Sequence, residues 1–229
     1  MTGGVKGWLP GARTPERKSM TGRTVRLEPL EADRHGDELF EASSVPDAGT
    51  RFTWLGDDPP QSRAAFQTWL EKAQASSDPL FFAVIDQASG KVAGRQTLMR
   101  IDANHGVAEI GNIYWGPLIS RKVAATEAQF LFASYIFDEL GYRRYEWKCD
   151  NANEPSKHAA KRFGFRFEGL FRQHMVIKGK NRDTAWFSII DQEWPALKIA
   201  YMKWLDPSNF DVAGQQIRRL EEFRADNQA

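Results

Sequence analysis

The chain has 229 residues, of which 41% are hydrophobic and 27% are charged, with 31 lysines and arginines against 30 aspartates and glutamates. This length and composition are typical of one large globular domain with its own apolar core, and they exclude a disordered chain. The formal net charge of +1 lacks the broad positive field that nucleic-acid or anionic-membrane binding requires, so any anion site must be local.

Cysteine and histidine are too sparse for a disulfide framework or a metal centre. Cys149 is the only cysteine, and no His or Cys pair has metal-ligand spacing, so we expect no metal. No signal peptide and no membrane-spanning stretch is found in the sequence. We therefore predict a cytoplasmic protein that binds neither membrane nor nucleic acid.

The first half of the chain begins with an irregular arm over residues 1–22, rich in glycine and proline and held to the body by Trp8 and Leu9. Period-two and helical patterns then alternate, with a loop predicted over 45–60. Short turn-rich connections between the last three strands predict an antiparallel meander. The predicted elements are a strand over 23–30, helices over 31–43 and 61–75, and strands over 80–86, 92–101 and 107–115.

The second half returns to a helical period at residues 126–140, with Gly141 as its C-terminal cap. Thr126 and Gln129 have capping-box spacing, and a first turn that begins a few residues earlier is the alternative. A hairpin follows, with a turn at 179–181 in which Gly179 takes a positive φ. The predicted elements are a strand over 143–149, a helix over 155–165, hairpin strands over 167–178 and 182–191, an amphipathic helix after Trp194, and a more polar helix within 214–229.

This order of elements predicts an α+β fold with a mixed sheet and helices on both faces. The first half of the sheet is antiparallel, and the helix after Trp115 crosses over to make the strand at 143–149 parallel to the strand at 107–115. The predicted division of the chain is an N-terminal arm (1–22), a single catalytic domain (23–194) and a C-terminal helical extension (195–229).

The stretch ISRKVAATEA, residues 119–128, lies where a strand passes through a loop into a helix. Such a helix start directs unpaired backbone N–H groups and a positive dipole end at one point, which favours phosphate oxygens. Val123, Ala124 and Ala125 can donate as glycine would, while Arg121 and Lys122 add positive charge. The alternative is an ordinary loop before a capped helix.

Several segments extend this reading to a family. ATEA, NANEPS, RFGFRFEGLFRQHMVIKGKNRD and SIIDQEW resemble the GNAT superfamily of N-acetyltransferases, in the branch related to the ribosomal-protein N-terminal acetyltransferases. The resemblance runs from about Arg23 to Trp194. It implies a GNAT-like fold, acetyl-CoA as cosubstrate, and a primary amine as acceptor, which a protein N-terminus could supply.

The resemblance also implies a set of coenzyme-binding residues. In the family a (Q/R)xxGx(G/A) loop binds the coenzyme A pyrophosphate; here Ser120 stands at the Gln/Arg position and Val123 at the first glycine, while Ala125 fits the last. Asn153 would bond the pantetheine arm and Ser156 would lie near the thioester sulfur, although both also suit helix capping. The implied coenzyme-binding residues are Ile113, Tyr114, Trp115, Ser120, Arg121, Lys122, Val123, Ala124, Ala125, Thr126, Asn153 and Ser156.

Three residues are candidates for catalysis. Glu109 is the candidate general base, because period-two spacing puts it on the same strand face as Gly111, Ile113 and Trp115. Its alternative is a structural ion pair. Tyr114 and Ser156 are candidates for the acid that protonates the leaving thiolate, with a plain sheet role as the alternative for Tyr114.

The sequence therefore predicts an N-acetyltransferase in which the amine attacks the thioester directly. A non-catalytic acyl-CoA-binding protein, a nucleic-acid-binding domain and a thioester enzyme using Cys149 are the weaker alternatives. The final helices are expected to cover a sheet edge or to form a homodimer contact. Four aromatic residues would line an acceptor pocket or pack in the core: Phe52, Trp54, Phe81 and Phe82.

Overall fold

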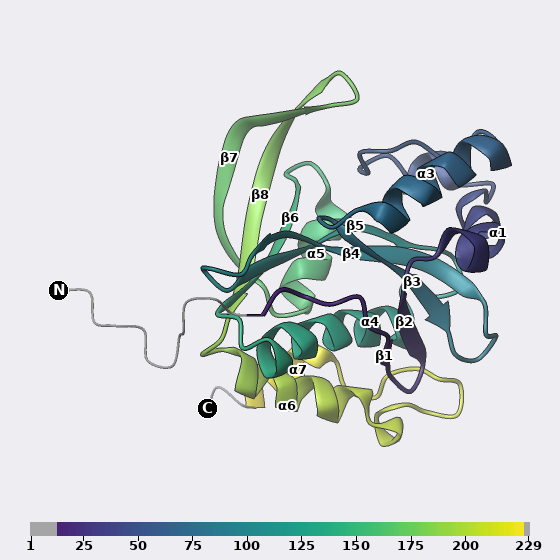
Figure 1. The fold of residues 1–229 in the computed structure, drawn as a ribbon. Coiled ribbons are helices and arrows are strands. Elements are labelled where there is room, and N and C mark those ends of the chain that lie inside the picture. Colours follow the sequence, from purple (N-terminus) through teal and green to yellow (C-terminus); the bar gives the residue numbers. More distant parts are fainter. Residues whose placement is uncertain (1–12, 227–229) are drawn as a thin grey trace.

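An eight-stranded mixed sheet runs through the molecule in the order β1-β2-β3-β4-β5-β6-β8-β7 (Figure 1). The structure is a computed structural model that describes residues 13–226. The strands are β1 (Met20–Thr21), β2 (Val25–Pro29), β3 (Leu80–Asp86), β4 (Val92–Asp102), β5 (Val107–Trp115), β6 (Arg144–Asp150), β7 (Arg166–Ile177) and β8 (Lys180–Ile190).

Helices cover both faces of this sheet (Figure 1). The α-helices are α1 (Ala32–Ser43), α2 (Ala48–Arg51), α3 (Arg63–Ala75), α4 (Val123–Ser134), α5 (Glu154–Arg162), α6 (Trp194–Leu205) and α7 (Leu220–Asp226). A π-helical turn, η1 (Tyr135–Glu139), extends α4, and a 3₁₀ turn, η2 (Pro207–Asn209), follows α6.

The predicted α+β class and sheet organisation are confirmed. Neighbouring strands from β1 to β5 pair antiparallel, and β5 pairs parallel with β6. The β6, β8 and β7 strands add a second antiparallel group. The sheet thus consists of two antiparallel groups, β1–β5 and β6–β8–β7, which are joined through the parallel β5–β6 pair.

Several local predictions were wrong. The loop expected over 45–60 contains the one-turn helix α2, and β1 lies in the arm expected to be irregular. Thr126 and Gln129 do not form a capping box, because α4 takes the alternative earlier start, at Val123. The hairpin turn is Lys178–Gly179, where both residues have positive φ (50° and 74°), rather than residues 179–181.

The C-terminal polar helix spans only 220–226. The predicted anchors Trp8 and Leu9 lie outside the described residues.

The apolar core has two layers, one on each face of the sheet. Strand β3 is buried along its whole apolar part, because alternate residues face opposite layers. Phe81 packs with α1 and α3 in one cluster, whereas Phe82 packs with α4 in the other. The Phe82 and Phe132 rings meet edge to face, with centroids 5.2 Å apart.

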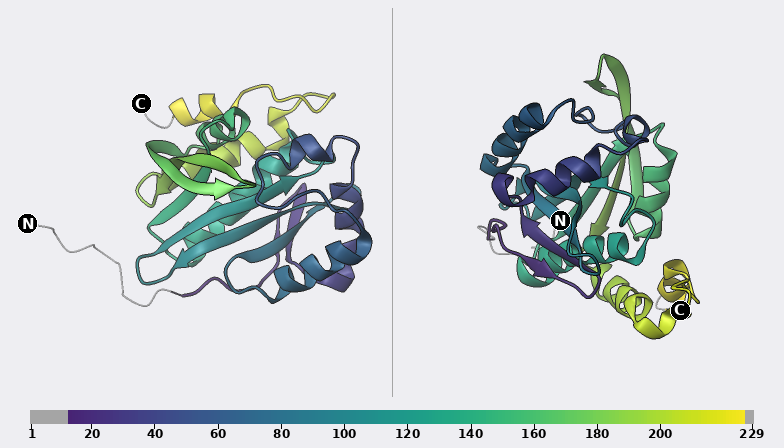
Figure 2. Two further views of the ribbon diagram at one scale, coloured as in Figure 1. Left: turned by 90° about the horizontal axis from the view of Figure 1, so that it is seen from above. Right: turned by 90° about the vertical axis from the view of Figure 1, so that its right-hand side faces the viewer.

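The C-terminal segment belongs to the second layer (Figure 2). Its helices α6 and α7 lie on the same face as α4, and Trp204, Leu220 and Phe223 are buried in the common cluster. The division of the chain into an arm, a catalytic domain and an extension stays a prediction. Within residues 13–226, no helix combines the length and the hydrophobicity needed to cross a bilayer.

Candidate active site

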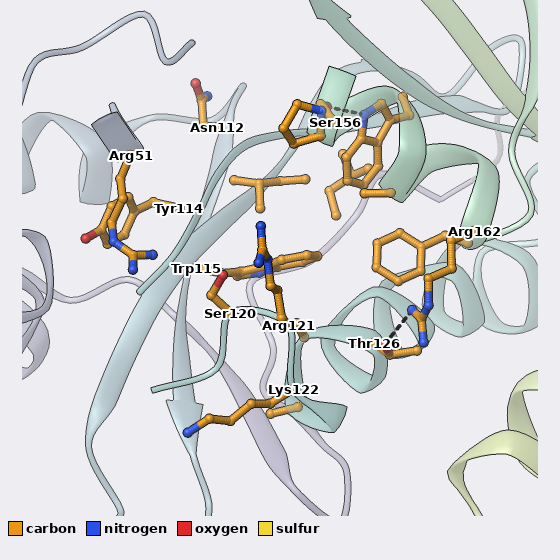
Figure 3. Close-up of a pocket in the computed structure, with 18 of the residues that line it drawn as sticks. Arg51, Asn112, Tyr114, Trp115, Ser120, Arg121, Lys122, Thr126, Ser156 and Arg162 are labelled. Atoms are coloured by element: carbon orange, nitrogen blue, oxygen red, sulfur yellow. Dashed lines mark hydrogen bonds between the residues drawn. The ribbon is translucent and has the colours of Figure 1, made fainter. Parts of the chain in front are cut away.

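The two halves of the sheet separate at a fork. Pairing between β5 and β6 covers only Val107–Ile110 against Arg144–Trp147, so β5 continues beyond this point without a partner in β6. A cleft of about 1740 Å³ opens there. Its walls are the free end of β5, the loop into α4, the start of α4, and α5 (Figure 3).

A β-bulge in β5 redirects the side chains at this fork. Thr97 pairs with Gly111 and Arg95 with Tyr114, so β5 has one more residue than β4 between the two pairs. Asn112 has a φ of 47° in this bulge. The close approach of β4 also requires Gly94, where an added Cβ would lie 2.1 Å from the Tyr114 carbonyl oxygen.

The bulge overturns the predicted alignment of one strand face. Because the extra residue reverses the alternation, Glu109 shares its face with Tyr114, not with Trp115. The Trp115 indole N–H donates instead to Gln96 Oε1 (3.1 Å) on the opposite face. Period-two counting fails here, and the sequence predicts no bulge because Asn112 is not a glycine.

The start of α4 presents unpaired backbone donors to the cleft. The Ala125 N–H bonds the Lys122 carbonyl (3.2 Å), whereas no acceptor is found within residues 13–226 for the N–H groups of Val123 and Ala124. Val123 is the first residue of the helix and therefore has a negative φ. The position that has the left-handed conformation is Arg121, with a φ of 61°.

The loop therefore differs from the predicted pattern in a specific way. The left-handed residue that glycine would favour is two positions before Val123, so the Val123 side chain imposes no backbone strain. Ser120, Arg121 and Lys122 all line the cleft, and no acidic residue stands in the first turn of α4. Figure 3 shows the Arg121 side chain in the middle of the cleft and Lys122 directed away from it.

Arg162 joins this region from α5, and the sequence prediction did not include it among the site residues. Its Nη1 donates to Thr126 Oγ1 (2.9 Å), in the first turns of α4 (Figure 3). The predicted coenzyme residue Thr126 is thus brought against a cation that the sequence did not predict for the site. Arg162 is the first residue of the segment RFGFRFEGLFRQHMVIKGKNRD, but the place of its side chain beside Thr126 follows only from the packing of α5 on α4.

Ser156 and Asn153 form the start of α5. The Asn153 side chain accepts the Ser156 N–H (3.1 Å) as an N-cap, which is the capping role left open by the sequence. The Trp147 indole donates to Ser156 Oγ (3.0 Å). An indole N–H only donates, so the Ser156 hydroxyl keeps its own proton for another acceptor.

Cys149 lies beside this serine and is buried. Burial raises the pKa of the Cys149 thiol, and a hydrogen bond with Ser156 opposes this rise only in part. A thiol held in its neutral form is a poor nucleophile, so the geometry disfavours a covalent route through Cys149.

Glu109 is at the centre of a buried charge network. Its side chain is 5% exposed and lies 2.9 Å from Lys148 Nζ and 3.4 Å from Arg100 Nε. Lys148 also contacts Glu146 Oε2 (2.6 Å). Burial raises the pKa of Glu109 and outweighs the attraction of Lys148. The predicted base is therefore ion-paired, yet it lines the cleft and holds its proton more strongly than an exposed glutamate.

Tyr114 lies across the cleft from Ser156 (Figure 3). Its hydroxyl donates to the Ala42 carbonyl (2.6 Å) at the end of α1, and its ring packs against Phe52 at 4.8 Å. Burial raises the pKa of this phenol. The proton expected to serve the leaving group is thus engaged in a main-chain hydrogen bond.

A loop and a hairpin tip meet at the other end of the cleft. Lys178 Nζ, at the tip of the β7–β8 hairpin, donates to the Phe52 carbonyl (3.0 Å) and lies 2.8 Å from Asp58 Oδ1. Of the four aromatic residues considered for an acceptor pocket, only Trp54 lines the cleft, with 40% of its surface exposed. Phe52, Phe81 and Phe82 are buried.

Across residues 13–226, no cluster of three or more His, Cys, Asp or Glu side chains is arranged to hold a metal ion. The hydrogen-bond donors that line the cleft include backbone amides, arginine side chains and hydroxyl groups. These groups suit phosphate and carbonyl oxygens.

Comparison with known proteins adds independent evidence. A family model described as "Acetyltransferase (GNAT) domain" matches residues 24–166. A crystal structure of a GCN5-related N-acetyltransferase from Brucella melitensis is 69% identical, with a TM-score of 0.95 over 96% of this chain and 100% of that chain.

Two Bacillus proteins match the chain over shorter regions. The "Uncharacterized N-acetyltransferase p20" of Bacillus licheniformis is 32% identical over 49% of this chain and 63% of its own length. The "Putative ribosomal N-acetyltransferase YdaF" of Bacillus subtilis (strain 168) is 30% identical over 48% of this chain and 59% of its own length. The chain thus spans about three fifths of the length of these curated relatives.

Proposed function

The chain belongs to the GNAT acetyltransferase family, and we propose that it transfers an acetyl group from acetyl-CoA to a primary amine by direct attack on the thioester. The resemblance inferred from the sequence is thereby confirmed at the level of the family. The observation that carries the proposal is the fork between β5 and β6, which opens beside the unpaired amides at the start of α4.

The residues at the start of α4 suit the diphosphate of the coenzyme. The N–H groups of Val123 and Ala124 would donate to its oxygens, and Arg121 would supply a charge-assisted hydrogen bond. Beyond Ile110, the main chain of β5 has no partner in β6 and would bond the amide groups of the pantetheine arm. Ile113, Tyr114 and Trp115 remain proposed contacts through this main chain.

Proton transfers are assigned to Glu109 and Ser156. The amine nitrogen bonds the acetyl carbon while the carbon–sulfur bond breaks, and Glu109 accepts the proton that the amine loses. Ser156 gives its proton to the departing thiolate, because its Oγ already accepts from Trp147 and its O–H, which also bonds the Cys149 sulfur, is the group left to donate. Tyr114 is the less favoured acid, since its hydroxyl is bonded to Ala42.

The need for a base depends on the acceptor. An α-amino group with a pKa of about 7.7 is roughly one-sixth neutral at pH 7, whereas a lysine amine with a pKa of about 10.4 is neutral in about one molecule in 2,500. A protein N-terminus is therefore the easier acceptor. The printed name of the Bacillus subtilis relative supports a protein substrate, and a small amine is the second acceptor class in this proposal.

The test is a turnover assay with an acceptor panel. Purified protein is incubated with acetyl-CoA and with peptides and amines, and the release of free thiol is followed. We expect acceptor-dependent thiol release with at least one primary amine. Tight binding of coenzyme A without acceptor-dependent release on any compound would instead identify a non-catalytic acyl-CoA-binding protein. A cytoplasmic location and a homodimer contact through the final helices stay predictions.

A further inference from the structure

We propose that Arg162 binds a phosphate group at the nucleotide end of the coenzyme, in a subsite whose outer wall is the C-terminal segment 204–216. This inference rests on the proposed function, because it takes coenzyme A as the ligand of the cleft. It goes beyond the predicted phosphate loop, since neither Arg162 nor this segment belongs to that loop.

The first observation is the charge of Arg162. Its guanidinium lines the cleft, and no carboxylate partner is found for it in the part of the chain that the structure describes. Among residues 13–226, Thr126 Oγ1 is the only acceptor bonded to the guanidinium, so most of its five N–H donors stay available. Burial lowers the pKa of the Arg162 guanidinium and outweighs the attraction of the nearby Glu221 carboxylate, so an anion in the cleft would stabilise this charge.

The second observation is the support of this side chain by aromatic rings. The Arg162 guanidinium lies 4.9 Å from the centroid of the Trp204 ring and 5.4 Å from that of Phe163. Such stacking holds the planar fork in place and leaves its edge free for oxygen atoms. The arrangement is therefore preorganised for a phosphate group.

The C-terminal segment fixes the Trp204 ring. The Trp204 indole donates to Gln216 Oε1 (2.9 Å), and the ring meets Phe210 edge to face at 5.2 Å. Phe210 and Gln216 also form an isolated β-bridge that closes the loop between them. Trp204, Phe210 and Gln216 line the cleft, although they follow residue 166, where the family model ends.

Arg162 lies at a different place along the cleft from the loop residue Arg121, so the two arginines can contact different phosphate oxygens of one ligand. Figure 3 shows Arg121 and Arg162 approaching the start of α4 from different sides, with Thr126 next to Arg162. Coenzyme A carries a diphosphate and a 3′-phosphate, which share the chemistry that an arginine recognises. The experiment distinguishes the two.

Calorimetry on four proteins tests this subsite. Wild type, Arg162→Gln, Arg162→Lys and the control Arg166→Gln are titrated with coenzyme A and with 3′-dephospho-coenzyme A. Arg166 is an exposed residue paired with Glu193, so its substitution removes one positive charge away from the cleft. We expect Arg162→Gln to raise the Kd for coenzyme A by about tenfold or more, Arg162→Lys to raise it less, and Arg166→Gln to leave it unchanged.

The second ligand identifies the phosphate. If Arg162 binds the 3′-phosphate, Arg162→Gln abolishes the preference for coenzyme A over the dephospho form. If it binds the diphosphate, both ligands weaken equally. Unchanged affinity in a folded Arg162→Gln or Arg162→Lys protein would overturn the inference while leaving the proposed function intact. A wild type that binds no coenzyme A would overturn both.

Discussion

Two carboxylates share one lysine at the fork of the sheet, and their environments separate their pKa values. Burial raises the pKa of Glu109 despite its contact with Lys148. Burial acts the same way on Glu146, but hydrogen bonds from Lys148 and Arg144 outweigh it and hold the pKa of Glu146 below its usual value. This separation of the two pKa values supports the proposal that Glu109, and not Glu146, accepts the proton of the amine.

Glu109→Gln should lower turnover more for a lysine-type amine than for an α-amine. Because the pKa of Glu109 is raised, the wild-type rate falls as pH decreases through that pKa, where the base becomes protonated. The variant should lack this acid limb. The matched control is Glu146→Gln, which removes the other partner of Lys148 and should keep the acid limb but move it to lower pH, because the Glu146 charge helps to raise the pKa of Glu109. Equal activity of Glu109→Gln and wild type on both acceptors, measured by thiol release, would remove Glu109 from the mechanism.

Ser156→Ala should lower kcat by about tenfold to a hundredfold while the Kd for coenzyme A changes little, because it removes the proposed proton donor. Tyr114→Phe is its counterpart. It should leave kcat nearly unchanged and cost about 1 kcal/mol of stability, since it breaks the hydrogen bond to Ala42. Steady-state kinetics and thermal unfolding check both variants. The reverse pattern, with kcat lost in Tyr114→Phe, would exchange the two roles.

At the scale of elements, the start of α4 is the proposed counterpart of a glycine-rich phosphate loop. Its donors are the N–H groups of Val123 and Ala124, and Lys122 ahead of them is extended, with φ −106° and ψ 172°. The residue before a proline has to adopt an extended conformation, and Lys122 already has one. The first position of a helix also tolerates proline without loss of a helical hydrogen bond.

Val123→Pro therefore removes a single N–H donor from the site without breaking the helix. We expect a rise of several-fold to tenfold in the Kd for coenzyme A, with a melting temperature close to that of wild type. Val123→Gly, which keeps the N–H, should bind at least as well as wild type, because the helical φ at this position also suits glycine and the donor is unchanged. Calorimetry that finds no weakening in a folded Val123→Pro protein would show that this amide does not bind the ligand.

The elements were predictable from the sequence where local pattern decides them. The alternation of Tyr145 and Trp147 identified β6, and the continuous apolar run of β3 reflects burial from both faces. The bulge at Asn112 was not predictable, because it depends on the approach of Gly94 in the neighbouring strand. Arg162 was also missed, since its role depends on Trp204, which reaches it only through the packing of α6.

At the scale of the whole molecule, the C-terminal segment is part of one core. Leu220 is fully buried in the same cluster as Phe132 and Tyr145, which belong to α4 and β6. The segment should therefore unfold together with the sheet. This continuity also explains how residues beyond the family model can take part in the cleft.

Leu220→Ala should reduce the free energy of unfolding by about 2–4 kcal/mol, because it leaves a cavity in the common core. The control is Ile217→Ala in the same segment, where the side chain is 65% exposed and the change should be within about 0.5 kcal/mol. Denaturant unfolding is followed by circular dichroism and tryptophan fluorescence. A single coincident transition is expected for both variants. A separate early transition in Leu220→Ala would indicate that the C-terminal segment folds independently.

The contact of Lys178 with Phe52 and Asp58 ties the tip of the β7–β8 hairpin to the segment between α2 and α3. Trp54 from that segment and Ile177 from the hairpin both line the cleft. Under the proposed function, an acceptor would enter between two tethered segments, and a flexible peptide end would fit this entrance more readily than the flat surface of a folded protein.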